Sequence, residues 1–400
     1  MAETDVSKLV IEDEFLSSDQ QDHEQPSTSS TRQTVKRKQS DDDGDDEDSD
    51  SNADQYLKDN THGKVIASHY NTLEEKGIYE RTKSKIFYMR NYNNWIKSML
   101  INEFMAKLKE KSWTAPVRVL DIGCGKGGDL LKWSKANITH IICTDLAEVS
   151  LEQCEARYKK INSKKDVKKP FTAEFFACDA TKTRLRSKYL DPSIELDLVS
   201  CQFAFHYCFE TLQQAECMLK NASECLRVGG YFIGTIPDAN EIMKRRVLSK
   251  SEEFGNDVYE ISILWETEQP PFFGAKYNFR LDNVVDCPEF LVHFPVLEKL
   301  ALKFGLKLVM KKRFEEYHDD MIKSGRFLIE KMQSLETYPA FNKHYQAEQT
   351  DESYSHAKKY IDNKMKYGNY RRPFRVGTIS QSEWEAISIY MVFAFEKIKT

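Results

Sequence analysis

The sequence lacks any uninterrupted apolar run of the roughly 20 residues that a membrane-spanning helix needs. Its nine cysteines include no C-x-x-C pair and no cysteine–histidine cluster at zinc spacing. A disulfide scaffold and a metal site are therefore not expected. Residues 1–5 are too acidic for a signal or transit peptide, so we expect reduced thiols in a cytosolic or nuclear protein without a membrane.

The two signs of charge are separated along the chain. Residues 1–60 hold 18 acidic and 6 basic residues, a net charge of −12, so that the remainder carries +7 within the total of −5. The negative charge of the whole chain therefore conceals that the remainder after residue 60 is basic. A basic domain suits a polyanionic substrate, although its excess of positive charge is modest for its length.

Residues 1–60 are rich in Ser, Asp, Glu and Gln and are predicted to be a disordered tail. A basic cluster at 35–38 precedes residues 41–50, which hold eight acids. The pair is either a solvated low-complexity stretch or a weak nuclear-import signal with an acidic segment that competes with RNA. Residues 61–400 are predicted to form the folded domain, with an insertion at about 237–300.

The clearest motif lies at 117–133. A short apolar run ends in Asp121, glycines follow at positions 123, 125, 127 and 128, and a helix-like segment begins near Asp129. This order predicts a strand, a tight loop and a helix. Glycines in such a loop let the backbone approach a nucleotide-like ligand, because a Cβ atom would be in the way.

Two classes of cofactor fit this loop. Gly123, Gly125 and Gly128 satisfy the dinucleotide pattern G-x-G-x-x-G. Gly123, Gly125 and Gly127 fit the D-x-G-x-G-x-G pattern of S-adenosylmethionine methyltransferases. Asp121 favours the second class, because a carboxylate there would repel a pyrophosphate and attract the positively charged methionine end of S-adenosylmethionine.

Polar residues also follow the next apolar runs. Asp145 ends the run at 140–144 and is placed to bind a ribose diol. Asp179 follows 175–178, where it could accept the amine of adenine or merely cap a strand. Gln202, His206 and Tyr207 follow the fourth run, a position that faces the transferred methyl group in many methyltransferases. These three residues are therefore added to the predicted site.

The pattern as a whole predicts an α/β fold. Strands are expected near 117–121, 140–145, 172–177, 196–201, 229–236, 306–313 and 387–396, and helices at 81–111 and 211–226. Alternating strands and helices imply a parallel sheet covered on both faces, with ligands at the carboxyl ends of its strands. The aromatic-rich insertion is expected to be a lid or a small β unit, and 370–375 is a basic segment.

Five motifs in order resemble one family, the eukaryotic mRNA cap guanine-N7 methyltransferases. They are Phe87–Lys97, Asp121–Leu130, Cys201–Tyr207, Pro288–Val292 and Glu383–Ala386, and the resemblance covers roughly residues 62–397. It implies a Rossmann-like class I methyltransferase fold, a seven-stranded mixed sheet with helices on both faces, an antiparallel last strand and an inserted cap-binding lid. It also implies methyl transfer from S-adenosylmethionine to N7 of the cap guanine of GpppN-RNA, with S-adenosylhomocysteine as the second product.

The resemblance further implies site residues. For the cofactor these are Lys97, Asp121, Gly123, Gly125, Asp145, Asp179, Gln202 and Tyr207. For the cap they are Asn93, Asn94, Lys126, Lys132, Arg157, His206, Glu289 and Tyr390. In this interpretation Lys97 reaches the methionine carboxylate, and Lys126, Lys132 and Arg157 hold the triphosphate. Glu289 accepts from guanine N1–H and N2–H together, and Tyr390 stacks on the purine.

Guanine N7 carries a lone pair and no proton, so it can attack the sulfonium methyl group without a general base. No catalytic base is nominated; His206 and Tyr207 are expected nearest the transfer. The implied partner is capped nascent mRNA in the nucleus. A small activating subunit and the transcription or capping machinery are further candidate partners. The alternative is a class I methyltransferase that acts on a small molecule or a protein. A further alternative is an inactive RNA-binding protein with the same fold.

Overall fold

The computed structural model describes residues 10–12, 61–72, 82, 84–111, 116–163, 170–282, 284–341, 349–350, 352–367 and 374–399. Apart from 10–12, the predicted tail at 1–60 lies outside these ranges, and so does its basic cluster at 35–38. Of the basic segment 370–375, only Phe374 and Arg375 are described. Among the described residues, no helix is both long enough and apolar enough to cross a membrane.

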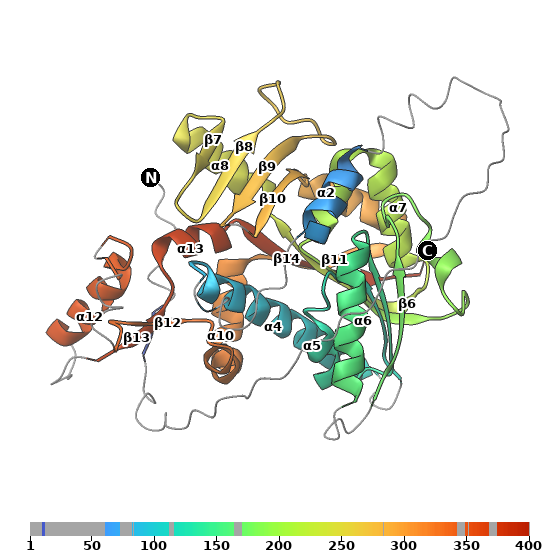
Figure 1. Cartoon of the computed structure of the whole chain (residues 1–400), viewed down its shortest axis with the longest axis horizontal. Coiled ribbons are helices and arrows are strands. Elements are labelled where there is room, and N and C mark those ends of the chain that lie inside the picture. The colour runs from blue at the N-terminus through green and yellow to red at the C-terminus, as the bar shows by residue number, and fades with distance from the viewer. Residues whose placement is uncertain are drawn as a thin grey trace, which may run out of the picture.

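A seven-stranded mixed sheet forms the centre of the molecule, in the order β11-β14-β6-β5-β2-β3-β4 (Figure 1). Its strands are β2 (Arg118–Ile122), β3 (His140–Asp145), β4 (Thr172–Ala177), β5 (Leu196–Gln202), β6 (Leu226–Pro237), β11 (Leu306–Arg313) and β14 (Tyr390–Lys397). The pairs between β4, β3, β2, β5 and β6 are all parallel. β14 lies antiparallel to both β6 and β11. The predicted fold class and the antiparallel last strand are thus confirmed.

Alternate residues of each central strand enter two separate cores. Val119 and Leu198 belong to one apolar cluster, whereas their neighbours Leu120 and Val199 belong to the other. Successive side chains of a strand point to opposite faces, so a sheet covered on both sides needs nearly continuous apolar strands. All seven residues of β5 are buried, although three of them, Asp197, Ser200 and Gln202, are polar.

Helices cover both faces. The first core holds side chains of α4 (Phe87–Lys111), α5 (Leu130–Lys135), α6 (Glu148–Asn162) and α10 (Phe314–Lys331). The second holds side chains of α7 (Leu212–Ser223) and α9 (Phe294–Lys303), with the short 3-10 helices η2 (Leu185–Lys188) and η3 (Phe205–Glu210). The two helix layers leave the carboxyl ends of the parallel strands at one common edge.

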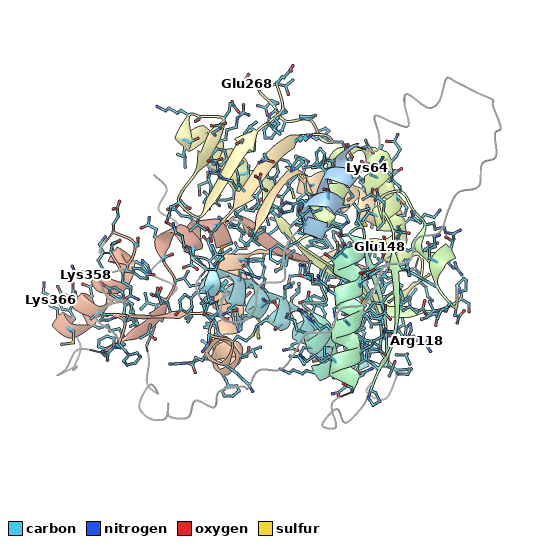
Figure 2. The ribbon with its side chains drawn as sticks, viewed as in Figure 1. Lys64, Arg118, Glu148, Glu268, Lys358 and Lys366 are labelled. Atoms are coloured by element: carbon cyan, nitrogen blue, oxygen red, sulfur yellow. The ribbon has the colours of Figure 1, made fainter. Side chains whose placement is uncertain are left out.

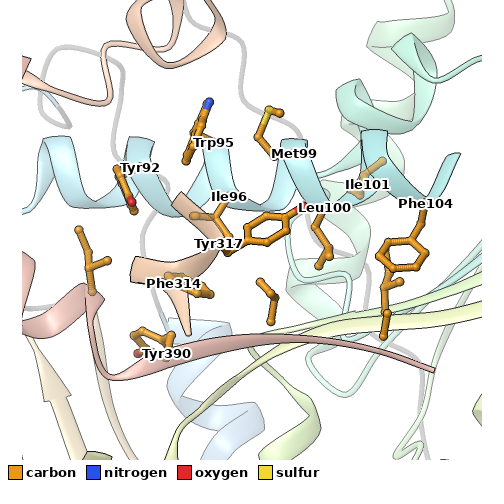
Figure 3. Close-up of a cluster of buried hydrophobic side chains, with 14 of the residues drawn as sticks. Tyr92, Trp95, Ile96, Met99, Leu100, Ile101, Phe104, Phe314, Tyr317 and Tyr390 are labelled. Atoms are coloured by element: carbon orange, nitrogen blue, oxygen red, sulfur yellow. The ribbon is translucent and has the colours of Figure 1, made fainter. Parts of the chain in front are cut away.

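The long helix α4 carries a wide apolar stripe. Figure 3 shows Trp95 and Met99 on one side of the helix, and Ile96 and Leu100 on the other side, facing Phe314 and Tyr317. The helix begins at Phe87, six residues later than the sequence pattern predicts. Ser84 Oγ accepts a hydrogen bond from the Ile86 backbone at 3.4 Å, and such local side-chain bonds favour a turn over a helix.

Residues 239–290 of the predicted insertion form a second unit on the carboxyl-end side of the sheet, whereas its last residues belong to α9 and pack on the main sheet. After α8 (Ala239–Ser249), four antiparallel strands follow in the order β10-β9-β8-β7 (Figure 1). They are β7 (Glu253–Gly255), β8 (Tyr259–Ile263), β9 (Lys276–Leu281) and β10 (Val285–Phe290). In the β9–β10 pair, Tyr277 lies directly opposite Glu289.

A third, three-stranded sheet lies away from the strand ends. Its order is β1 (Ile11–Glu12), β13 (Val376–Thr378) and β12 (Glu336–Tyr338). α12 (Ser355–Tyr367) packs against it, and α13 (Gln381–Ile387) leads from it into β14. Figure 2 shows Lys358 and Lys366 of α12 at the opposite end of the molecule from Lys64 and Glu148. β1 lies inside the range predicted as disordered, so Ile11 and Glu12 are an exception to that prediction.

Helix α2 (Thr61–Thr72) packs against both α6 and β10. The Val149 backbone N–H donates to Asn71 Oδ1 at 3.2 Å, and the His62 ring meets Phe290 edge-on at 4.7 Å. α2 therefore bridges the main sheet's helices and the inserted unit, next to the strand ends.

Candidate active site

The glycine loop follows β2 as the sequence predicts. Gly123 has a positive φ of 71°, and its N–H donates to the Thr144 carbonyl at 2.8 Å. A Cβ atom on Gly123 would stand 2.7 Å from Cβ of Ala204. Both the backbone angle and the close approach require glycine here, which keeps the loop pressed against the strand ends.

Asp145 holds the loop from the neighbouring strand. Its Oδ2 accepts from the Gly125 N–H at 2.8 Å, and its Oδ1 accepts from the Ala147 N–H at 2.8 Å. Burial raises the pKa of the Asp145 carboxyl above its ordinary value. Two predicted cofactor residues, Gly125 and Asp145, are thus in direct contact.

Asp121 is buried and lies beside Trp133. Trp133 Nε1 donates to Asp121 Oδ2 at 3.2 Å. Burial, with the nearby negative charge of Asp129, raises the pKa of the Asp121 carboxyl to about 8. The direct contact of Asp121 with the methionine end of the cofactor stays a prediction.

Asp129 joins two cationic residues that the sequence assigned to different ligands. Lys97 Nζ lies 3.0 Å from Asp129 Oδ2, and Lys132 Nζ lies 2.7 Å from Oδ1. Lys132 also donates to Asn94 Oδ1 at 3.0 Å. Burial opposes ionisation of Asp129, but the two ammonium groups hold its pKa below the ordinary value. The predicted cofactor lysine and cap lysine therefore share one buried carboxylate.

Two further predicted cofactor residues lie at the ends of β4 and β5. Asp179 Oδ1 accepts from both the backbone N–H (2.9 Å) and the hydroxyl (2.6 Å) of Thr181, and its Oδ2 lies 3.6 Å from where a Cβ of Gly63 would be. Gln202 Nε2 donates to Ser200 Oγ at 3.2 Å. Within the described part of the chain, Gln202 Oε1 is buried without a hydrogen-bond partner, so it is available to a ligand.

A second polar cluster lies where η3 meets the inserted sheet. His206 Nε2 lies 3.3 Å from Glu289 Oε1, and Tyr277 donates to Glu289 Oε2 at 2.7 Å. His206 and Glu289 are 2% and 4% exposed. Neither ring nitrogen of His206 has a well-aligned hydrogen bond among the described residues. A buried carboxylate beside an unsatisfied imidazole is costly without a ligand, which is typical of a binding site.

Aromatic side chains surround this cluster. The hydroxyls of Tyr70 and Tyr207 lie 3.3 Å apart, which links α2 to η3. The Tyr390 ring packs edge-on to Phe203, with centroids 5.0 Å apart. The negative charge of Glu289 adds to burial in raising the pKa values of Tyr207 and Tyr390. Tyr207, Glu289 and Tyr390, predicted from distant parts of the sequence, are therefore close neighbours.

The remaining predicted cap residues are half-buried. Lys126 lies in the glycine loop, Arg157 lies on α6 near the Cys154 thiol, and Asn93 lies on α4 next to Asn94. Asn93 Oδ1 is buried without a hydrogen-bond partner in the described part of the chain. The assignment of these three residues to the cap stays a prediction.

Three residues of the site were not predicted. Asp129 was part of a motif but was not given a role, because its two lysine partners are not adjacent in sequence. Tyr277 stands opposite Glu289 in a hairpin, a relationship that cross-strand pairing would have revealed. Tyr70 comes from α2, a helix that was not among those predicted from the sequence.

The strand order and the loop define the class of protein. A sheet of six parallel strands with one antiparallel strand, β14, inserted between β6 and β11, and with D-x-G-x-G-x-G after the first strand, is the class I fold of S-adenosylmethionine-dependent methyltransferases. Acidic residues, Asp145 and Asp179, follow at the ends of the next two strands.

Comparison with known proteins identifies the family. Residues 53–398 match the model of the mRNA (guanine-N(7))-methyltransferase domain. The mRNA cap guanine-N(7) methyltransferase of Drosophila melanogaster is 52% identical over 346 residues, covering 85% of this chain and 78% of that protein. The Caenorhabditis elegans enzyme is 41% identical (84% and 87% covered), and that of Schizosaccharomyces pombe is 34% identical (83% and 82%).

The chain belongs to the mRNA cap guanine-N7 methyltransferases, and it is an S-adenosylmethionine-dependent enzyme that acts on capped mRNA. Among solved structures, a S-adenosylmethionine-dependent methyltransferase from Clostridium acetobutylicum has a TM-score of 0.40 at 12% identity, covering 77% of this chain and 92% of that one. Because this TM-score is low, the fold assignment rests on the strand order and not on this similarity.

Proposed function

We propose that the enzyme holds the cap guanine against Glu289 and transfers the methyl group by in-line attack of N7, with no general base. The observation that carries this proposal is the pairing of a buried carboxylate, Glu289, with a single hydroxyl donor, Tyr277. One oxygen of the carboxylate is bound by the protein, and the other faces His206 at 3.3 Å. A buried carboxylate with an oxygen that the protein does not bind requires hydrogen-bond donors from a ligand.

Guanine offers the required donors. Its N1–H and N2–H lie side by side on one edge, whereas adenine has no such pair of donors. Glu289 would be left unpaired against adenine, and an unpaired buried charge strongly disfavours the wrong base. Tyr390 is the proposed stacking partner and His206 a contact of the guanine or its ribose. Stacking of a base on an aromatic ring contributes about 1–3 kcal/mol.

S-adenosylmethionine would bind along the strand ends. Its ribose hydroxyls suit Asp145, the adenine amine suits Asp179, and its carboxylate suits Lys97. Gly123 and Gly125 would let the backbone come close, and Gln202 and Tyr207 would lie near the sulfonium. This assignment is supported by the contact between Gly125 and Asp145 and by the free Gln202 Oε1 among the described residues.

The triphosphate bridge of the cap would meet Lys126, Lys132 and Arg157, and Asn93 and Asn94 would contact the adjoining nucleoside. Cations of this kind position a polyanion without reading its sequence. Lys132 is already paired with Asp129. Its ammonium is therefore held in one place before the phosphates arrive, at the cost of part of its attraction for them.

The chemistry requires alignment rather than proton transfer. Guanine N7 has a lone pair, the methyl carbon is its target, and the sulfur leaves as the thioether of S-adenosylhomocysteine. Fixing these three atoms in line can lower the barrier by roughly 7–11 kcal/mol. The side chains of this chain would then bind, orient and exclude water, with His206 and Tyr207 nearest the transfer.

The test is methyl transfer from labelled S-adenosylmethionine to GpppA-ended RNA, with ApppA-ended RNA as control and the product digested to nucleosides. The proposal requires label at N7 of the cap guanine and none in the control. Equal labelling of both RNAs, or labelling of a protein or small molecule instead, would favour the alternative substrate class. A Glu289→Ala variant should lose the transfer while still binding S-adenosylhomocysteine.

Capped nascent transcripts are made in the nucleus, so we further propose a nuclear location, with the basic cluster at 35–38 as an import signal. A small activating subunit and the capping or transcription machinery are the proposed protein partners. Imaging of a fluorescent fusion with Lys36, Arg37 and Lys38 replaced by alanine tests the signal. An unchanged nuclear location would remove this role from the cluster.

A further inference from the structure

Three cysteines that are scattered in the sequence meet under the glycine loop. Cys124 lies in the loop, Cys143 in β3 and Cys154 in α6, and their three Sγ atoms lie within 4.8 Å of one another. Among the residues that the structure describes, no other group of three His, Cys, Asp or Glu side chains brings its ligand atoms this close.

The cluster has the size of a metal site. A metal–sulfur bond of about 2.3 Å places three sulfurs around one ion at about 4 Å from each other. The observed spacing of up to 4.8 Å therefore needs a contraction of less than about 1 Å, which side-chain rotation can supply. Of the other cysteines, Cys201, Cys208, Cys225 and Cys287 are buried as small apolar side chains, whereas Cys178 and Cys217 are half-buried.

We propose that Cys124, Cys143 and Cys154 bind one soft metal ion, Cu⁺ or Zn²⁺, beneath the loop that carries the cofactor. Three sulfur donors without an oxygen or nitrogen ligand select soft ions over Mg²⁺ or Ca²⁺. Cys143 and Cys154 are buried, whereas Cys124 is half-buried, so the ion would enter from the loop.

The chemistry is ligand exchange. Each thiol releases its proton to solvent and forms one metal–sulfur bond, and no atom changes its oxidation state. Three thiolates around Cu⁺ carry a net charge of −2, and around Zn²⁺ a net charge of −1. Arg157 is positioned to offset part of this charge, because its guanidinium acts electrostatically on Cys154. Zn²⁺ would need a water molecule as its fourth ligand, which the half-buried side of Cys124 can admit.

The site is coupled to the loop by direct contact. A Cβ atom on Gly127 would stand 2.8 Å from the Cys154 Sγ, and Cys124 is the residue between Gly123 and Gly125. An ion that draws Cys124 toward Cys143 and Cys154 therefore acts on the segment proposed to hold S-adenosylmethionine. Only this last coupling depends on the proposed function; the metal site itself does not.

The experiment titrates the full-length, metal-free protein with Cu⁺ against a coloured Cu⁺ chelator under anaerobic conditions, and separately with Zn²⁺ against a coloured Zn²⁺ chelator. We expect one ion per chain and a thiolate-to-metal charge-transfer band. Cys124→Ser, Cys143→Ser and Cys154→Ser should each weaken binding by more than about 100-fold, since even changes behind the ligands cost about 10- to 100-fold. Cys217→Ser is the matched control, because Cys217 is half-buried outside the cluster.

The two arms identify the ion, and either one supports the site if the three variants weaken binding as expected. Absence of stoichiometric binding in both arms would overturn the proposal, and so would an unchanged affinity in Cys124→Ser. Thermal melting and binding of S-adenosylhomocysteine show whether each variant is folded. Cys124→Ala serves as a second variant, because its site lies at the edge of the core and its small side chain fits the same space.

Discussion

The Tyr277 hydroxyl donates to Glu289 Oε2 at 2.7 Å, and the two residues are direct cross-strand partners in the β9–β10 hairpin. A neighbouring strand thus fixes the orientation of the carboxylate that is proposed to read the guanine. Tyr277 itself is fully buried, and burial with the nearby Glu289 charge raises its pKa, so it stays a donor at any physiological pH.

Replacing Tyr277 by phenylalanine should weaken cap binding specifically. A hydrogen bond to a charged group contributes about 1.5–3 kcal/mol, which corresponds to roughly 10- to 100-fold in affinity. We expect the KM for capped RNA to rise within that range and the KM for S-adenosylmethionine to stay unchanged. Tyr259→Phe in the same sheet is the control, since its hydroxyl bonds Arg245. Equal effects of both variants on cap KM would contradict the role of Tyr277.

Alanine substitutions in the loop should separate the two cofactor patterns. Gly123→Ala places a Cβ at 2.7 Å from Ala204, and Gly127→Ala places one at 2.8 Å from Cys154, both with positive φ. At Gly128 nothing lies within 4 Å of the added atom. Calorimetry should find S-adenosylhomocysteine binding reduced at least about tenfold in the first two variants, a loss of about 1.4 kcal/mol, and nearly unchanged in the third. Gly123 belongs to both patterns, so the other two variants separate them: a dinucleotide loop would depend on Gly128 and not on Gly127.

Replacing Asp129 by asparagine should affect both substrates. The change leaves Lys97 and Lys132 without their shared carboxylate, and breaking a buried pair typically costs about 3–5 kcal/mol of unfolding free energy. We expect a lower Tm and a higher KM for both S-adenosylmethionine and capped RNA. Asp197→Asn, which breaks the Arg227 pair elsewhere, should lower the Tm alone. A variant of Asp129 with normal KM values would show that the lysines need no anchor.

The stability of the cofactor-free enzyme should fall as the pH rises, because of Asp121. Its pKa of about 8 in the folded chain lies above the value of about 3.9 for an unfolded aspartate. Between these values the unfolded chain has lost the proton and the folded chain keeps it, so unfolding becomes easier until the pH passes 8. Tm measurements from pH 5 to 9 should show a smaller fall for Asp121→Asn. Parallel curves would contradict the shifted pKa.

His206 should act in binding rather than in chemistry. If N7 needs no base, His206→Ala should raise the KM for capped RNA and leave kcat within a few-fold of the parent. The kcat of the parent should also be flat with pH across the ordinary titration range of histidine, near pH 6.5. A collapse of kcat at unchanged KM, or a kcat that follows a single ionisation near that pH, would make His206 a proton-transfer group.

The central sheet could be predicted because each parallel strand appears in the sequence as a short apolar run that ends in a polar residue. β3, β4 and β11 begin and end at the predicted residues, and only the ends of the other strands differ. Periodicity over 81–111 identified α4 but not its start at Phe87, because a local bond of Ser84 decides the boundary. Boundaries of this kind depend on single side chains that periodicity does not register.

Contacts between distant residues were harder to predict. The resemblance supplied Glu289 and Lys97, but neither Tyr277 nor Asp129, which hold these residues in place. The thiol cluster was not expected either, since Cys124, Cys143 and Cys154 are 19 and 11 residues apart and follow no zinc spacing. The turn of the loop, the end of a strand and the first turns of a helix bring them together, which only the folded chain reveals.

The small sheet β1-β13-β12 has a consequence for shortened versions of the protein. Val376 and Gly377 of β13 pair on one side with β12 and on the other with Ile11 and Glu12. A chain that begins after residue 50 would lack that outer strand, and β13 would present unpaired N–H and C=O groups along an open rim. Exposed strand edges of this kind pair with strands of other molecules. Self-association of a truncated protein would therefore result from the loss of β1 rather than from damage to the catalytic domain.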